Sequence, residues 1–176
     1  MKRVVIIIGQ LTHGGSERQL YHLLRHCDRE AIEPYLVLSG TGGYWQEPIA
    51  ALDVPITLLS GSPIQKLWQF RRVTLDWGAD TFLSWSAYTN IFAFALFGRG
   101  IKRIGSFRNV KIEDPEHFKK VFQWAKLNAL NTVICNSRET YDSLLPDLRS
   151  KQDLLYVPNG TDPIGDHDRH RRHWRA

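Results

Sequence analysis

The sequence predicts an α/β protein whose core is a doubly wound parallel sheet of about seven strands. Three observations lead to this prediction. Short apolar runs recur along the chain, and they alternate with longer segments in which apolar residues repeat with helical spacing. Clusters rich in glycine, proline, serine and asparagine separate the two kinds of segment. Strands that alternate with helices are typical of βαβ units, which build a parallel sheet with helices on both faces.

The elements are expected in a regular order. Strands are predicted at residues 4–8, 35–39, 54–59, 81–85, 101–106, 131–135 and 153–157. Helices are predicted at residues 19–27, 45–52, 63–77, 87–97, 118–129 and 137–145, with a loop at 110–116 and Ser137 as an N-cap. Ligands of such sheets bind at the carboxyl ends of the strands, where the strand order reverses. We therefore expect the loops at 9–15, 84–90, 106–110, 135–138 and 157–160 to form the site.

The turn between the first strand and the first helix is the strongest local signal. It runs from Gly9 to Arg18 and holds two adjacent glycines, Gly14 and Gly15. Unpaired backbone N–H groups and the helix dipole favour an anion at a helix N-terminus, and glycine lets a ligand approach the backbone. Ser16 is expected to be the N-cap, with Gln19 completing a capping box. A loop whose glycines only permit the turn remains the alternative.

Composition limits the possible partners. The chain has 176 residues, of which 43% are hydrophobic, so one globular domain with a real core is expected. The formal net charge is +5, and residues 163–176 contribute four Arg and two Asp to it, so the remainder is only mildly basic. No nucleic-acid partner is expected from so small an excess. An anionic substrate or a membrane surface fits it equally well.

The two cysteines indicate a reducing compartment. Cys27 and Cys135 are expected in apolar packing on a helix and a strand, without a disulfide, so the cytoplasm is the expected location. The chain start shows no cleavage site typical of a signal peptide, and no apolar run reaches the roughly 20 residues that cross a bilayer. The histidines of the tail (His167, His170 and His173) lie on no predicted element, and no metal site is expected.

Several common nucleotide motifs are absent. A dinucleotide fold needs G-x-G-x-x-G directly after the first strand, but four residues separate Gly9 from the glycine pair. A P-loop needs G-K-[ST], and the chain reads Gly15-Ser16-Glu17. The acidic cluster of a response regulator is also missing.

Four segments instead resemble family-4 glycosyltransferases of the GT-B fold. The residues Gly14-Gly15-Ser16-Glu17-Arg18 resemble the G-G-x-E-R turn of that family, and Ser106-Phe107-Arg108-Asn109 resembles an S-x-R-N loop found in a subgroup. The stretch from Val133 to Ser137 resembles the strand, N/S-S, helix step. The stretch from Tyr156 to Asp162 resembles the V-x-P-N-G-[IVT]-D segment that closes the N-terminal domain.

The resemblance implies one half of a two-domain enzyme. It implies a Rossmann-like, acceptor-binding N-terminal domain at residues 1–162, followed by a linker or tail at 163–176. The donor-binding C-terminal domain, with its E-x7-E motif, has no match in this sequence. The implied whole is a retaining hexosyltransferase that uses a nucleotide-sugar donor and a glycan or lipid-linked acceptor in polysaccharide or glycoconjugate assembly, without a metal or other cofactor. The chain alone is expected to be inactive.

The resemblance also assigns expected binding residues. Gly14 and Gly15 are expected to face the donor diphosphate. Arg108 stands near the place of a histidine found in many members, and it is expected to hold a phosphate or to pair with a carboxylate such as Glu113 or Asp114. Asn109, His13 and Arg18 are expected contacts, while Asn159 and Gly160 form the interdomain hinge. None of these is a catalytic acid or base.

Three other interpretations remain open. One is a GT-B sugar epimerase, which would lack the G-G-x-E-R turn and the P-N-G-x-D closure. Another is a stand-alone binding module for anionic glycans or lipids. Relatives also dock on membranes through aromatic and basic residues of this domain. Here the segment 87–97 contains Phe92, Phe94 and Phe97, and basic residues follow it. Peripheral contact with the inner face of the membrane is therefore a further expectation; the residues involved are Trp68, Arg71, Arg72, Arg99, Lys102 and Arg103.

Overall fold

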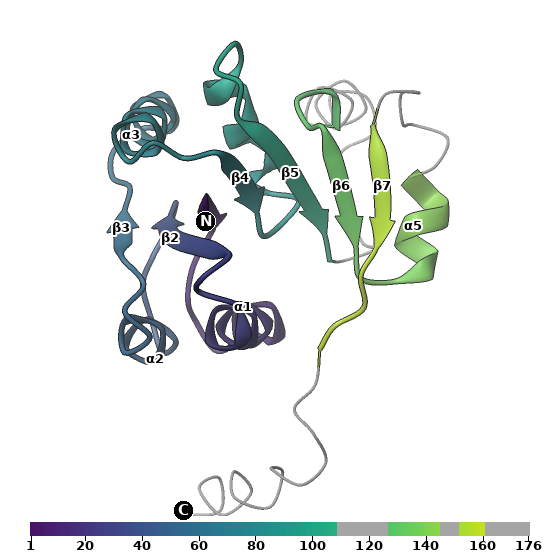
Figure 1. Ribbon diagram of the computed structural model, residues 1–176, viewed down its shortest axis with the longest axis horizontal. Coiled ribbons are helices and arrows are strands. Elements are labelled where there is room, and N and C mark those ends of the chain that lie inside the picture. Colours follow the sequence, from purple (N-terminus) through teal and green to yellow (C-terminus); the bar gives the residue numbers. More distant parts are fainter. Residues whose placement is uncertain (109–126, 145–151, 161–176) are drawn as a thin grey trace, which may run out of the picture.

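A computed structural model describes residues 1–108, 127–144 and 152–160. These residues form a single sheet of seven parallel strands, so the predicted Rossmann-like α/β fold is confirmed (Figure 1). The strands are β1 (Lys2–Ile8), β2 (Ile32–Leu38), β3 (Ile56–Leu58), β4 (Thr81–Ser84), β5 (Lys102–Phe107), β6 (Thr132–Cys135) and β7 (Asp153–Tyr156). Their order in the sheet is β3-β2-β1-β4-β5-β6-β7, and each neighbouring pair is parallel.

Helices cover both faces of the sheet. They are α1 (Gly15–His26), α2 (Gln46–Ala50), α3 (Pro63–Asp76), the 3-10 helix η1 (Thr89–Leu96) and α5 (Arg138–Leu144). Figure 1 shows α1 and α2 on one side of strands β1–β3 and α3 on the other. Two buried clusters match these layers, since alternate residues of β1 belong to each: Val5 and Ile7 to one, Ile6 and Ile8 to the other. Alternation along a strand sends successive side chains to opposite faces.

Local capping explains two helix starts that the sequence predicts. The Ser62 Oγ accepts a hydrogen bond from the Gln65 N–H, the Gln65 Oε1 accepts one from the Ser62 N–H, and Pro63 opens α3. This reciprocal arrangement pairs N–H groups that a helix start otherwise leaves unbonded. At the start of α5 the Ser137 Oγ accepts from the Thr140 N–H at 3.1 Å, which is one half of such an arrangement.

Three expectations on the elements need correction. The segment predicted as a helix at 87–97 is the 3-10 helix η1, and a nearly all-apolar stretch carries no periodicity that separates the two helix types. The second strand begins at Ile32, before the predicted start at residue 35, and it includes Pro34. Pro34 lies opposite Val4 of β1, while β3, on the other side of this strand, pairs only with residues 36–38. The third strand is shorter than predicted. The predicted loop at 110–116 and helix residues 118–126 lie outside the described residues.

The strand order reverses between β1 and β4. The chain first builds outward from β1 to β2 and β3, and then returns to place β4 on the other side of β1. Crevices at the carboxyl ends of strands on either side of such a reversal are where open α/β sheets bind ligands. None of the helices within the described ranges is both long and apolar enough to span a bilayer.

Candidate functional site

The glycine turn lies at the point of strand reversal. It follows Ile8, and Gly14 is the N-cap of α1, with extended backbone angles (φ −120°, ψ 157°). The Gly14 carbonyl already accepts the first helical bond from the Arg18 N–H at 3.1 Å. The prediction of Ser16 as N-cap is therefore wrong, because the helix begins at Gly15. Gln19 closes no capping box, and its Nε2 instead donates to the Gly160 carbonyl at 2.8 Å.

The two glycines have different surroundings. A Cβ at position 14 would overlap the carboxylate of Glu17, which is folded back over the turn and is only 8% exposed. Thr12 Oγ1 lies 3.5 Å from Glu17 Oε1. A Cβ at Gly15 would meet nothing within 4 Å. The helix dipole stabilises the Glu17 carboxylate at this end, so an internal anion already covers Gly14 while Gly15 stays open to a ligand.

Arg108 lies at the centre of a polar cluster at the carboxyl edge. It directly follows β5, and its guanidinium carbon lies 3.7 Å from the ring centroid of Trp85, just beyond β4. Its Nη1 donates to Asn159 Oδ1 at 3.3 Å, and Asn136 Nδ2 donates to the same oxygen at 3.4 Å. Trp85 Nε1 in turn donates to the Ser16 carbonyl at 2.8 Å. Figure 1 shows the arrowheads of β4, β5, β6 and β7 pointing to one edge, which is why residues so distant in sequence meet.

The Arg108 guanidinium is a cation without a carboxylate partner among the described residues. Its Nε is buried and has no hydrogen-bond partner in that part of the chain. Burial lowers the pKa of Arg108 to about 10, so the side chain is still protonated at neutral pH. A guanidinium has five N–H donors in a planar fork that matches phosphate and carboxylate oxygens. Because only one bond to a neutral amide and one ring contact are present, this cluster can accept an anion. The alternative partners Glu113 and Asp114 lie outside the described residues.

The other predicted site residues divide into three groups. Asn159 and Gly160, the predicted hinge, both contact the cluster, through Arg108 and Gln19 respectively. His13 is exposed and its ring contacts Tyr44 in a tilted arrangement, with 4.4 Å between ring centroids. Arg18 is exposed on the first turn of α1. Asn109 lies outside the described residues.

Sequence reasoning missed four residues of this region. They are Trp85, Asn136, Gln19 and Tyr44. Trp85 and Asn136 occur in loops that were expected to gather at the site, so the strand pattern contained a signal for them. Gln19 and Gly160 are 141 positions apart, and nothing in the local sequence indicates their contact. Among the described residues no group of His, Cys, Asp and Glu could hold a metal ion.

A family model decides the classification. The model that describes Glycosyltransferase Family 4 matches residues 13–164. The chain belongs to this family. The matched range includes the glycine turn, Arg108 and the segment around Asn159, so the family assignment covers every element that carries the cluster. No curated protein matches the sequence significantly.

Solved structures show the same fold at low identity. HepE from Anabaena, in complex with UDP and glucose, is 16% identical with a TM-score of 0.68, and the alignment covers 99% of this chain and 50% of that one. A glycosyltransferase from Rickettsia africae is 12% identical with a TM-score of 0.71, covering 98% and 49%. A UDP-GlcNAc 2-epimerase from Methanocaldococcus jannaschii is 12% identical with a TM-score of 0.61, covering 90% and 46%.

These likenesses support the fold and no finer property. Glycosyltransferases and epimerases both contain it, as the sequence interpretation anticipated, and the family model places this chain with the glycosyltransferases. The chain spans about half the length of these structures.

Proposed function

We propose that this chain is the acceptor-binding N-terminal domain of a retaining hexosyltransferase that uses a nucleotide-sugar. The observation that carries the proposal is the Arg108 guanidinium, which has no carboxylate partner among the described residues and packs on Trp85, the residue that donates to Ser16 of the glycine turn. Both features lie within the part of the chain that the family-4 model matches. The role is in cell-surface polysaccharide or glycoconjugate assembly in the cytoplasm, without a metal cofactor. HepE, which was solved with UDP-glucose, supports a nucleotide-sugar as donor.

The chemistry of transfer explains why a cation belongs here. The bond between the anomeric carbon and the diphosphate breaks, the acceptor hydroxyl oxygen forms the new glycosidic bond, and the hydroxyl proton passes to the departing diphosphate. Negative charge develops on the departing diphosphate. Preorganised donors that face such charge lower the barrier most effectively in a site from which water is excluded. In the proposed role the first-turn N–H groups of α1 and the Arg108 fork form one wall, and the second domain supplies the other.

Transfer activity is expected only when both domains are present. The full-length protein should release nucleoside diphosphate from a matching UDP-, GDP- or dTDP-sugar, with retention of the anomeric configuration in the product. Residues 1–176 alone should show no release above the uncatalysed rate, since the donor-binding half is absent. Chromatographic measurement of nucleoside diphosphate, with the product configuration determined by NMR, tests both statements. Transfer by residues 1–176 alone would contradict the proposal, and so would inversion by the full-length protein.

We also propose that the domain contacts the inner face of the membrane through its α3–η1 surface. This surface is defined by Ile64, Trp68, Arg72, Phe94 and Phe97, of which Ile64 is 80% and Trp68 62% exposed. Arg72 lies over the Trp68 ring at 5.7 Å, and Arg103 lies over the Phe97 ring at 4.6 Å. Arg71 donates to the Ala95 carbonyl and so joins α3 to η1. Aromatic and basic side chains together suit an anionic lipid interface.

Vesicle binding tests this surface. Residues 1–176 should co-sediment with vesicles of phosphatidylglycerol and phosphatidylcholine and remain in solution with phosphatidylcholine alone. The double variant Trp68→Ala with Arg72→Gln should lose about tenfold in partitioning, since one basic residue near such a surface accounts for roughly 1 kcal/mol and burial of the Trp68 ring in the lipid interface adds to it. Leu58→Ala, which removes an exposed apolar side chain from β3, is the matched control and should bind as the parent does. The proposal would be rejected if the double variant co-sedimented with the anionic vesicles as strongly as the parent, or if the parent did not co-sediment with them at all.

A further inference from the structure

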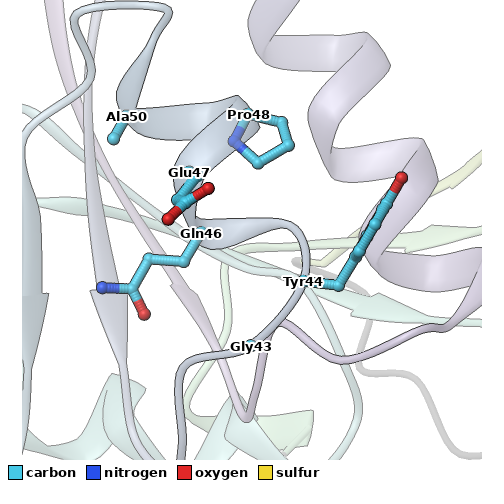
Figure 2. Close-up of a pocket in the computed structure, with 6 residues that line it drawn as sticks. All are labelled: Gly43, Tyr44, Gln46, Glu47, Pro48 and Ala50. Atoms are coloured by element: carbon cyan, nitrogen blue, oxygen red, sulfur yellow. The ribbon is translucent and has the colours of Figure 1, made fainter.

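A concave region lies beside the loop after β2, on the other side of β1 from β5 and Arg108. It is a cavity of about 610 Å³ formed by the loop after β2 and the short helix α2. Its lining consists of Gly43, Tyr44, Gln46, Glu47, Pro48 and Ala50. Figure 2 shows the carboxylate of Glu47 between the side chains of Gln46 and Pro48, with Tyr44 at the other end of the loop beside a helix. The residues of this lining are exposed, apart from the half-buried Pro48, so the cavity is open to solvent.

An aromatic group holds one wall of this cavity in place. The ring of Tyr44 is 45% exposed, yet it contacts His13 at 4.4 Å and the edge of Trp45 at 5.1 Å between centroids. Trp45 also contacts Tyr21 of α1 at 5.2 Å. Ring pairs at such separations are mutually attractive, so Tyr44 is fixed before any ligand arrives. A fixed ring costs less conformational entropy on binding than a free one.

The backbone joins this wall to the glycine turn. The Trp45 N–H donates to the Leu11 carbonyl at 3.0 Å, and the Leu11 N–H donates to the Thr41 carbonyl at 3.3 Å. A Cβ at Gly43 would lie 2.7 Å from the same Leu11 oxygen, so the two loops touch where only glycine fits. The cavity therefore keeps a defined position relative to Gly14 and Gly15.

The charge of the lining disfavours an anion. Among the described residues, the one charged side chain of the lining is the Glu47 carboxylate, and the Gln46 amide is a second polar group. Carboxylate oxygens accept hydrogen bonds from hydroxyl groups, and bonds to a charged acceptor are roughly twice as strong as neutral ones. An aromatic ring offers an apolar face to a ligand whose other edge is polar. This combination matches the C–H face and the hydroxyl edge of a neutral pyranose.

We infer that this cavity binds a neutral sugar ring of the acceptor, with Tyr44 packing against its apolar face and Glu47 accepting from its hydroxyl groups. The inference rests on the proposed transferase function and adds the chemical class of the acceptor residue. The domain then contains two binding sites with different ligands. The Arg108 cluster binds the anionic group of a substrate, and the cavity beside the loop after β2 binds an uncharged sugar.

Direct binding measurements test the inference without transfer activity. Saturation-transfer NMR on residues 1–176 with the methyl glycosides of glucose, galactose, mannose and N-acetylglucosamine should detect at least one of them in the millimolar range. Tyr44→Ala should weaken that binding at least about tenfold, whereas Tyr44→Phe should retain it because the ring remains. Glu47→Gln should also weaken it. Glu30→Gln, an exposed carboxylate in the loop after α1, is the matched control and should leave it unchanged.

The outcomes separate this inference from the proposed function. The sugar site is overturned if no glycoside binds, or if Tyr44→Ala binds as well as the parent and its circular dichroism shows the same fold. In either case, release of nucleoside diphosphate by the full-length protein would still support the transferase function. Sugar binding that depends on Tyr44, together with no release by the full-length protein, supports the site and overturns the transferase. Tighter binding of glucose 6-phosphate than of methyl glucoside to the same cavity would overturn the assignment of a neutral ligand.

Discussion

Replacing Arg108 with methionine is expected to lower kcat/KM of the full-length protein about 10- to 100-fold, the range that follows from losing one or two charge-assisted hydrogen bonds. The reason is that the guanidinium offers free donors at the carboxyl edge, including a buried Nε without a partner in the described chain. Methionine keeps an unbranched, polarizable side chain over the Trp85 ring but cannot hold an anion. Steady-state kinetics with the nucleotide-sugar measures the loss.

The same substitution should leave the fold at least as stable. Burial lowers the pKa of Arg108 to about 10, which means that the folded state disfavours its charge. At pH values between that pKa and the ordinary pKa range of arginine, the unfolded chain binds more protons than the folded chain. The free energy of unfolding of the parent therefore rises with pH in this interval. Below pH 10 the cost of the buried charge is fully present. The free energy of unfolding of Arg108→Met, measured with denaturant, should therefore exceed that of the parent most at neutral pH, and the difference should shrink above pH 10.

Arg25→Met is the control for this experiment. Arg25 is exposed in the last turn of α1, at the opposite end of the helix from the glycine turn. It should change neither kcat/KM nor the pH dependence of unfolding by a comparable amount. Full activity of Arg108→Met would exclude an anion-binding role, and a large loss of stability at neutral pH would indicate that Arg108 is mainly structural.

Replacing Gly43 with alanine is expected to lower the free energy of unfolding by about 2 kcal/mol, the cost typical of strained backbone or overpacking. The added Cβ would lie 2.7 Å from the Leu11 carbonyl oxygen and 3.2 Å from the Thr12 Cα. Both are backbone atoms, so no side-chain rotation relieves the contact, and the two loops must separate. The Trp45 to Leu11 hydrogen bond should be lost with them, and glycoside binding should weaken.

Gly15→Ala is the matched control for stability. Its Cβ would meet nothing within 4 Å, and alanine is a better helix former than glycine, so unfolding should need at least as much free energy as in the parent. Urea denaturation of both variants measures the difference. Equal stability of Gly43→Ala and Gly15→Ala would show that the two loops are not held together at Leu11.

Much of this structure was predictable from apolar spacing and turn chemistry. The central strands follow from short apolar runs, because a strand covered by helices on both faces buries nearly all its side chains. The starts of α3 and α5 follow from Ser62 and Ser137, whose hydroxyl groups bond to the backbone of the next turn. The capping of α1 was not predictable in the same way. Gly14 and Ser16 both suit an N-cap, and the backbone angles at Gly14 decide between them.

The sequence by itself determined the parallel α/β fold, the glycine turn at its first crossover and the family-4 motifs. Only the tertiary structure decided which residues share the site. Arg108 meets Trp85 and Asn159, and Gln19 meets Gly160, because the parallel strands end at one edge and the reversal places β4 beside β1. Periodicity reports which face of an element is buried, and it carries no information on which elements become neighbours. For the same reason the sequence did not predict the cavity at Tyr44. Its wall depends on contacts between α1, the glycine turn and the loop after β2.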